Sequence, residues 1–179
     1  MKKSGMAVLG FSLLTALFVL AAPTSYNVSG KVVYDAKGPT GRFKGSNESV
    51  SGNFSLEGNK LSGKICVDLS KWASGEPVRD THTRGMFEVD KYPQACMDLS
   101  SVEGNIASGN ATLVGSLNIH GKDQALKVPV TIKMNGNKML VEGQFETKVT
   151  DWGMKRPSLL GITVDDLVKV AFSAEASPQ

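Results

Sequence analysis

The chain has 179 residues, of which 41% are hydrophobic, and a formal net charge of +3. This length suits a single domain with a real core. Without residues 1–21 the chain keeps 18 basic and 17 acidic residues, a net charge of +1, which argues against a nucleic-acid-binding surface.

The N-terminus has the pattern of a secretory signal peptide. Lys2 and Lys3 precede an apolar run over residues 6–20, and the small residues Ala21 and Ala22 follow it. We expect cleavage after Ala21, with Ala22 as the second choice, and a mature domain of residues 22–179. A transmembrane anchor is the alternative, but the run is shorter than the roughly 20 residues that span a membrane. The sequence therefore predicts a periplasmic or secreted protein without a stable membrane anchor.

The mature chain alternates apolar and polar residues with a period of two, which is typical of β-strands with one buried face. Short turns such as Gly58-Asn59 and Asn135-Gly136 separate the segments and favour antiparallel neighbours. We therefore predict an all-β fold, an eight-stranded antiparallel lipocalin-like barrel, with a two-sheet sandwich as the alternative. The expected strands cover residues 26–34, 50–56, 65–69, 95–99, 113–119, 126–134, 139–149 and 164–174.

One long connection, residues 78–93, breaks this alternation and mixes charged with large apolar residues. We expect a short helical turn in it, with Asp80 capping its amides and Gly85 ending it in the left-handed conformation. Met86 and Phe87 would then face the interior, so that the connection forms a lid on the barrel. Arg79 and Asp80 are expected to pair within the loop.

Several glycines fall on the inward parity of their strands. Glycine there either permits the bends that barrel closure requires or leaves the centre of the barrel open. An eight-stranded barrel can be filled by its own side chains or can hold one small ligand. We expect an open cavity, and the glycines concerned are Gly30, Gly52, Gly63, Gly115 and Gly143.

The two cysteines, Cys66 and Cys96, lie in similar local sequences, each with an aspartate and a leucine two and three residues later. In an oxidising compartment a disulfide is the expected state. Two unpaired thiols, or a redox-active or metal-binding pair, are the alternatives.

Enzyme signatures are scarce. The chain has neither a Gly-x-Ser-x-Gly elbow nor a P-loop. His82 and Asp80 could belong to a Ser-His-Asp site, but the sequence spacing identifies no nucleophile for it. His120 lies at a turn. The histidines and cysteines also lack the spacing of a metal site. We therefore expect a protein that is not an enzyme, with no catalytic residues and no metal.

Taken together, the motifs resemble those of the YceI-like family, over residues 61–176. The first block is Arg79-Asp80 with His82, followed by Met86-Phe87-Glu88-Val89 and Tyr92-Pro93. The second is Gly115-Ser116-Leu117-Asn118-Ile119-His120-Gly121 before Val128-Pro129-Val130. The third is Asp151-Trp152-Gly153-Met154, then Pro157, Gly161-Ile162 and Asp166-Leu167-Val168-Lys169-Val170.

This resemblance implies a periplasmic barrel that carries a long polyisoprenoid or similar amphiphilic lipid, without other cofactors, in a role such as stress response or lipid or quinone carriage. It also implies a homodimer as a common assembly. A barrel with a filled core that serves as an interaction module, and a redox accessory that uses Cys66 and Cys96, are the alternatives.

The expected pocket residues come from strand parity and from the two long connections. A lipid chain needs a long apolar wall, since each buried methylene contributes about 0.8 kcal/mol. Candidates for its polar head group are Arg79, His82 and Arg84. The candidates for the wall and lid are Phe54, Met86, Phe87, Met97, Leu117, Ile119, Val130, Ile132, Phe145, Trp152 and Phe172.

Overall fold

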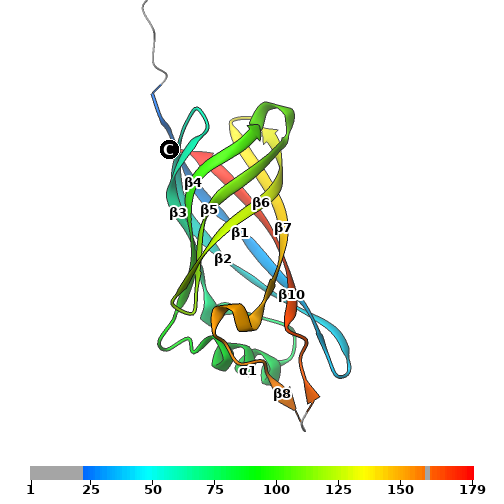
Figure 1. Ribbon diagram of the computed structural model, residues 1–179. Helices are drawn as coiled ribbons and strands as arrows, with labels where there is room; N and C mark the ends of the chain where they lie inside the picture. Colours follow the sequence, from blue (N-terminus) through cyan, green and yellow to red (C-terminus); the bar gives the residue numbers. More distant parts are fainter. Residues whose placement is uncertain (1–21, 160–161) are drawn as a thin grey trace, which may run out of the picture.

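A computed structural model describes residues 22–159 and 162–179 as a closed, eight-stranded antiparallel barrel (Figure 1). The expected signal peptide, residues 1–21, lies outside the described residues. Each strand pairs with its neighbour in the chain, and the last strand closes the ring against the first, which confirms the predicted fold class. The wall consists of β1 (Thr24–Gly38), β2 (Gly41–Glu57), β3 (Lys60–Asp68), β4 (Gln94–Asn105), β5 (Asn110–Ile119), β6 (Lys122–Asn135), β7 (Lys138–Lys148) and β10 (Leu167–Pro178).

The remaining elements lie in the connections. Near one end of the barrel are α1 (Pro77–Phe87) and the short 3-10 helices η1 (Leu69–Lys71) and η3 (Val149–Trp152), while η2 (Ile106–Ser108) joins β4 to β5. A small hairpin of β8 (Ser158–Leu159) and β9 (Ile162–Thr163) projects at the α1 end (Figure 1).

The last wall strand begins later than the alternation indicated. We expected it to start at Val164, but β10 starts at Leu167. The backbone amide of Val164 instead donates to the carbonyl of Pro157, at the base of the β8–β9 hairpin, over a distance of 2.9 Å. Val164 thus lies at the end of a local hairpin and outside the barrel wall. Alternation of apolar and polar residues over a short stretch does not distinguish the two.

The helical turn expected in residues 78–93 is a full helix, α1, and two details of the prediction were wrong. Asp80 does not cap the helix: its Oδ1 accepts hydrogen bonds from the amide and the hydroxyl of Ser74, at 2.8 and 2.6 Å. The helix also continues through Gly85, and the left-handed residue that ends it is Glu88, at φ 49°. The amide of Glu88 donates to the Gly85 carbonyl, so the helix end is satisfied without glycine at that position.

Four of the five inward glycines lie where the backbone of a neighbouring strand comes close, and these are Gly30, Gly52, Gly63 and Gly115. A Cβ atom on Gly63 would collide with the backbone of Asn53 and Phe54 on the neighbouring strand. The β3–β4 register shifts between Lys60 and Gly63, as a β-bulge does. Close strand approach and bulges at such points supply the curvature that barrel closure needs. At these positions glycine therefore permits the close strand approach, and beside Gly63 the bulge, that a curved wall requires.

The predicted disulfide is confirmed. Cys66 on β3 and Cys96 on β4 are direct cross-strand partners, with their Cα atoms 4.1 Å apart, and they are bonded. The bond closes a loop that includes η1 and α1, because both helices lie between the two cysteines in the chain.

Removal of this bond is expected to lower stability substantially. The sequence separation of the two cysteines is 30 residues, and the chain-entropy model gives about 3–4 kcal/mol for a loop of this size. Urea unfolding of the Cys66→Ala/Cys96→Ala variant should show this loss without a change in the far-UV circular dichroism of the native state. A free energy of unfolding equal to that of the parent protein would contradict it.

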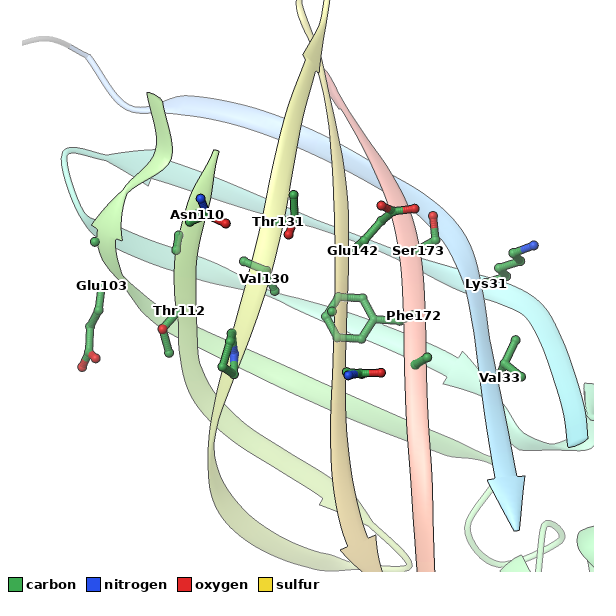
Figure 2. A pocket seen from close by; sticks show the side chains of 16 residues that line it. Lys31, Val33, Glu103, Asn110, Thr112, Val130, Thr131, Glu142, Phe172 and Ser173 are labelled. Carbon is green, nitrogen blue, oxygen red and sulfur yellow. The ribbon is translucent and has the colours of Figure 1, made fainter. Parts of the chain in front are cut away.

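The outer face of the barrel carries a groove of about 970 Å3 that crosses from β1 to β4 (Figure 2). One cross-strand row in it joins Lys31 to Ser173, Ser173 to Glu142, and Glu142 to Thr131. A second row contains Val33, Ala171 and Pro129. The second row has only short side chains, whereas the first also carries the charged side chains of Lys31 and Glu142.

Candidate ligand-binding cavity

The barrel interior is an apolar cavity of about 750 Å3. Inward-facing side chains such as Phe54, Leu113 and Phe145 keep part of their accessible surface even though they point into the barrel. A side chain in a packed core would lose that surface, so the interior is hollow. A cavity of this size is within the range of small-molecule sites.

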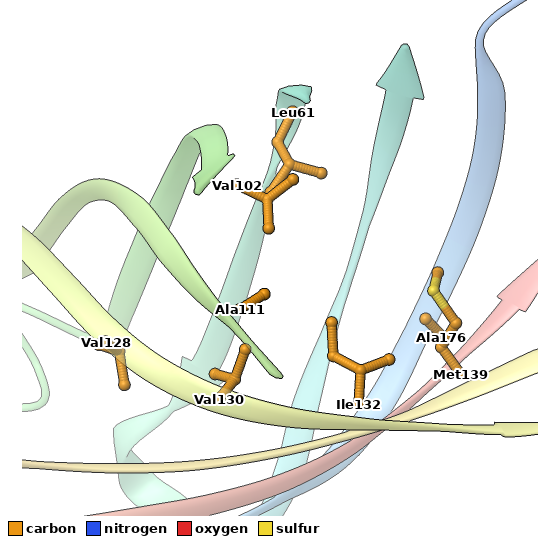
Figure 3. Close-up of a cluster of buried hydrophobic side chains, with 8 residues drawn as sticks. All are labelled: Leu61, Val102, Ala111, Val128, Val130, Ile132, Met139 and Ala176. Carbon is orange, nitrogen blue, oxygen red and sulfur yellow. The ribbon is translucent and has the colours of Figure 1, made fainter. Parts of the chain in front are cut away.

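The end of the cavity away from α1 is sealed by a cluster of buried side chains (Figure 3). Leu61, Val102 and Ala176 each retain at most 5% of their accessible surface. They come from strands next to the β2–β3 and β4–β5 turns and the C-terminus, which are far apart in the sequence. The cavity is therefore a pocket with one closed end.

Helix α1 covers the other end of the cavity, and we call it the lid helix. Met86 and Phe87 from its last turn border the cavity, as we expected. The ring of Phe87 stacks on Trp72, with centroids 6.4 Å apart. Beyond its C-terminus, Glu88 pairs with His120 in the β5–β6 turn, and Tyr92 contacts the His120 ring. The C-terminal end of the lid helix is thus attached to the barrel through the β5–β6 turn.

A row of aromatic rings lies beneath the lid helix. Tyr34 contacts Phe43 edge-on and Trp72 at a tilt, with centroid distances of 6.1 and 5.0 Å. The guanidinium carbon of Arg79 lies 4.7 Å from the Phe43 ring centroid, a cation–π contact. Arg79 is therefore engaged with an aromatic ring, whereas we had expected it to pair with Asp80.

Tyr34 is the polar group under the lid helix whose titration is shifted. Burial raises the pKa of its hydroxyl above the usual value near 10, because the phenolate would lose its hydration. The neutral form is thus favoured in the folded state. Its contribution to stability is fully present below about pH 10 and is lost as the pH rises through the folded-state pKa.

An ultraviolet absorbance titration can test this shift, because the chain has only three tyrosines, Tyr26, Tyr34 and Tyr92. We expect one phenol of the folded protein to ionise at higher pH than the others, and the Tyr34→Phe variant to lack that last step. If the last step persists in Tyr34→Phe, the raised pKa belongs to another tyrosine.

The structure places most of the predicted pocket residues around this one cavity. Two do not border it. Val130 is buried in the cluster of Figure 3 and borders the outer groove. Arg84 donates to the Thr81 hydroxyl at 3.2 Å. Those that border the cavity are Phe54, Met86, Phe87, Met97, Leu117, Ile119, Ile132, Phe145, Trp152, Phe172, Arg79 and His82.

Sequence reasoning missed Trp72, Phe43 and Glu76 as cavity-lining residues. Phe43 precedes the part of β2 that we recognised as a strand. Trp72 lies in the connection after η1, where no alternation indicates which side faces inward. The only signal in the sequence for Trp72 was that a large aromatic residue lies shortly before the connection at residues 78–93.

Within residues 22–159 and 162–179, no group of three or more His, Cys, Asp or Glu side chains is placed to hold a metal ion. No helix there is both long and apolar enough to cross a membrane.

The fold and cavity together define a lipocalin-like class of barrel, in which a closed antiparallel wall surrounds a space large enough for a small ligand. A model of the YceI-like domain matches residues 23–176. The chain therefore belongs to the YceI-like family. A search of curated proteins finds no match.

Solved structures with the same fold come from several bacteria. BcnA of Burkholderia cenocepacia is similar with a TM-score of 0.73 and 22% identity, over 83% of this chain and 96% of that one. A polyisoprenoid binding domain from Saccharophagus degradans, implicated in plant cell wall breakdown, is similar with a TM-score of 0.66 and 14% identity. The match covers 85% of this chain and 98% of that one. The YceI protein of Campylobacter jejuni is similar with a TM-score of 0.62 and 13% identity, over 100% of this chain and 99% of that one.

Proposed function

We propose that the protein is a non-catalytic binding protein that holds a long-chain amphiphilic lipid, such as a polyisoprenoid, inside the barrel. The observation that carries this proposal is the hollow apolar interior, closed at one end and covered at the other by the lid helix. Membership of the YceI-like family and the fold shared with a polyisoprenoid binding domain support the choice of ligand.

The chemistry of the wall favours a ligand that is mostly hydrocarbon. Side chains from every wall strand border the cavity, and most are aliphatic or aromatic. Each methylene buried against them contributes about 0.8 kcal/mol, so affinity rises with chain length until the cavity is full. The pocket residues predicted from the sequence form this wall in the proposal, apart from Val130.

The polar end of the ligand is proposed to lie at the lid end of the cavity. There Arg79 and His82 border the cavity together with Glu76 and Thr83. Arg79 supplies a positive charge and hydrogen-bond donors, and His82 is exposed to solvent. Arg84, which does not border the cavity, is left out of the proposed head-group site.

The proposed setting is the periplasm or the exterior of the cell, reached through a cleaved signal peptide, with no stable membrane anchor and with assembly as a homodimer. The Cys66–Cys96 disulfide supports an oxidising compartment. In such a compartment the protein would carry lipids or quinones or take part in a stress response.

The test is to purify the protein from its native host, extract it with organic solvent and identify the extract by mass spectrometry. We expect a defined amphiphile in a fixed molar ratio to the protein. A matched sample denatured and refolded without lipid should regain binding when the extract is returned. If the native protein yields no lipid and takes up no apolar probe, the proposal is wrong.

A further inference from the structure

Strands β6 and β7 are paired along only part of their length. Their ladder runs from Asn135↔Lys138 to Val130↔Gly143 and ends there. Below this point β6 stays paired with β5 as far as Lys122, and β7 with β10 as far as Lys148. The two strands diverge toward the lid end of the barrel (Figure 1). We call residues 126–129 of β6 and 144–148 of β7 the β6–β7 seam.

The sequence explains where the ladder stops. Pro129 is the next residue of β6 beyond the last pair, and proline has no backbone N–H to contribute to a ladder. On β7 the last paired residue is Gly143, which has no side chain to pack against its neighbour. Both residue types weaken a sheet, and here they stand on adjacent strands at the same level.

At the upper end of the seam, the outer groove and the internal cavity border the same side chain. Phe172 lines both, and Val130 and Gly143 also line the groove (Figure 2). The space that a Gly143 side chain would occupy is taken by Phe172 and Val130: a Cβ there would lie 2.7 Å from Phe172 Cζ and 2.9 Å from Val130 Cγ1. The Phe172 ring therefore lies in the wall at the point where the ladder ends.

The lower end of the seam is held by side chains rather than by strand pairing. The Gln124 side-chain amide donates to the Asp151 carbonyl at 3.1 Å, and the Lys122 amine lies 3.4 Å from the same oxygen. The Trp152 indole donates to the Thr147 hydroxyl at 2.8 Å. Helix η3 thus closes the base of the seam, and the stretch between η3 and Gly143 relies on side-chain packing.

Inner-face residues of both seam strands border the cavity. Val128 and Leu126 line it from β6, and Phe145 and Thr147 line it from β7. A separation of the seam strands would therefore open directly onto the apolar wall. It would break no ladder pair between these segments, whereas displacement of the lid helix would break the Arg79–Phe43 contact and the Glu88–His120 pair.

We infer that the ligand enters and leaves the barrel sideways through the β6–β7 seam, past the ring of Phe172, while the lid helix stays in place. This inference rests on the proposed function. A long chain can move laterally from the outer groove into the cavity through an opening along its length. The lid helix then retains the polar end of the ligand and is not its entrance.

The test is to lock the seam with a reversible cross-link. Because Val130 pairs with Gly143, Pro129 and Gln144 are the next opposed positions, and both face the outer groove. In the Pro129→Cys/Gln144→Cys variant, oxidation should slow both uptake and release of N-phenyl-1-naphthylamine about tenfold in stopped-flow fluorescence. The equilibrium affinity should stay the same, and reduction of the engineered bond should restore the rates.

The matched control places the same bond two residues further along, where the strands are already paired. Thr131 and Glu142 are direct partners on the outer face, so oxidised Thr131→Cys/Glu142→Cys should exchange the probe at the parent rate. Peptide mapping should show that Cys66–Cys96 is intact in both variants.

The outcomes separate this inference from the proposed function. If the parent protein binds the probe and the locked seam changes neither rate, the seam is not the entrance and the inference is overturned. An equal slowing in the control variant would overturn it as well. A parent protein that binds no probe would instead contradict the proposed function, and this inference with it.

Discussion

Filling the cavity from its own wall is expected to abolish ligand binding while the barrel stays folded. Leu99 on β4 and Leu113 on β5 both border the cavity and are only partly buried. In the Leu99→Trp/Leu113→Trp variant, the two indoles would occupy space that is otherwise available to a ligand chain. Exclusion of four methylenes would remove about 3 kcal/mol, roughly a hundredfold in affinity.

The measurement is a titration of the refolded, lipid-free protein with an apolar fluorescent probe, together with the lipid content of protein from the native host. The control adds the same two tryptophans on the outside, at Ser62 and Ala125, which are exposed. We expect Ser62→Trp/Ala125→Trp to bind as the parent does. The thermal midpoint of the wall variant should be equal to or higher than that of the parent, because new apolar contacts replace empty space.

Two results would contradict this prediction. Unchanged affinity in a folded Leu99→Trp/Leu113→Trp variant would mean that the ligand does not use the cavity. An equal loss in the outer control would place the binding site on the surface, which is the interaction-module alternative considered from the sequence.

The wall of the barrel could be predicted from the sequence because its signal is local. A strand with one buried face alternates residue by residue, and each short turn assigns an antiparallel neighbour. Cys66 and Cys96 were predicted as partners on the same basis, since both occupy the polar side of alternating strands. Closure of β10 onto β1 then followed from the need to leave no exposed edge.

The details of the lid helix and the seam could not be predicted in the same way, because strand alternation does not determine the side-chain partners or the exact register there. Asp80 has the residue type of a helix cap, yet the helix already begins at Pro77, and the carboxylate of Asp80 accepts from Ser74 in the connection before it. Arg84 carries the charge expected of a head-group residue, but its position on the helix directs it to Thr81. Pro129 lies within a strand predicted to pair with its neighbour across the Asn135-Gly136 turn, and only the observed register shows that this ladder ends beside it.

Trp152 is expected to be the most important single side chain for stability at the lid end of the barrel. It retains 2% of its accessible surface and packs with Val149 and Met154 in one buried cluster. The Trp152→Ala variant should lose about 3–5 kcal/mol, the usual cost of removing a large buried aromatic residue. Urea unfolding followed by far-UV circular dichroism would measure this, because that signal does not depend on the tryptophan removed.

The conservative variant separates packing from hydrogen bonding. Trp152→Phe keeps an aromatic ring but removes the donor to Thr147, so we expect it to lose about 1–2 kcal/mol more than packing alone would require. Thr147→Val removes the acceptor and should cost a similar amount, because the buried indole N–H is left without a partner. If Trp152→Ala costs no more than Thr147→Val, the contribution of Trp152 lies in its hydrogen bond and not in its packing at the base of the seam. A separate expectation concerns ligand exchange. In Trp152→Ala, η3 would lose its bond to Thr147 on β7, so we expect faster uptake and release of the probe than in the parent protein.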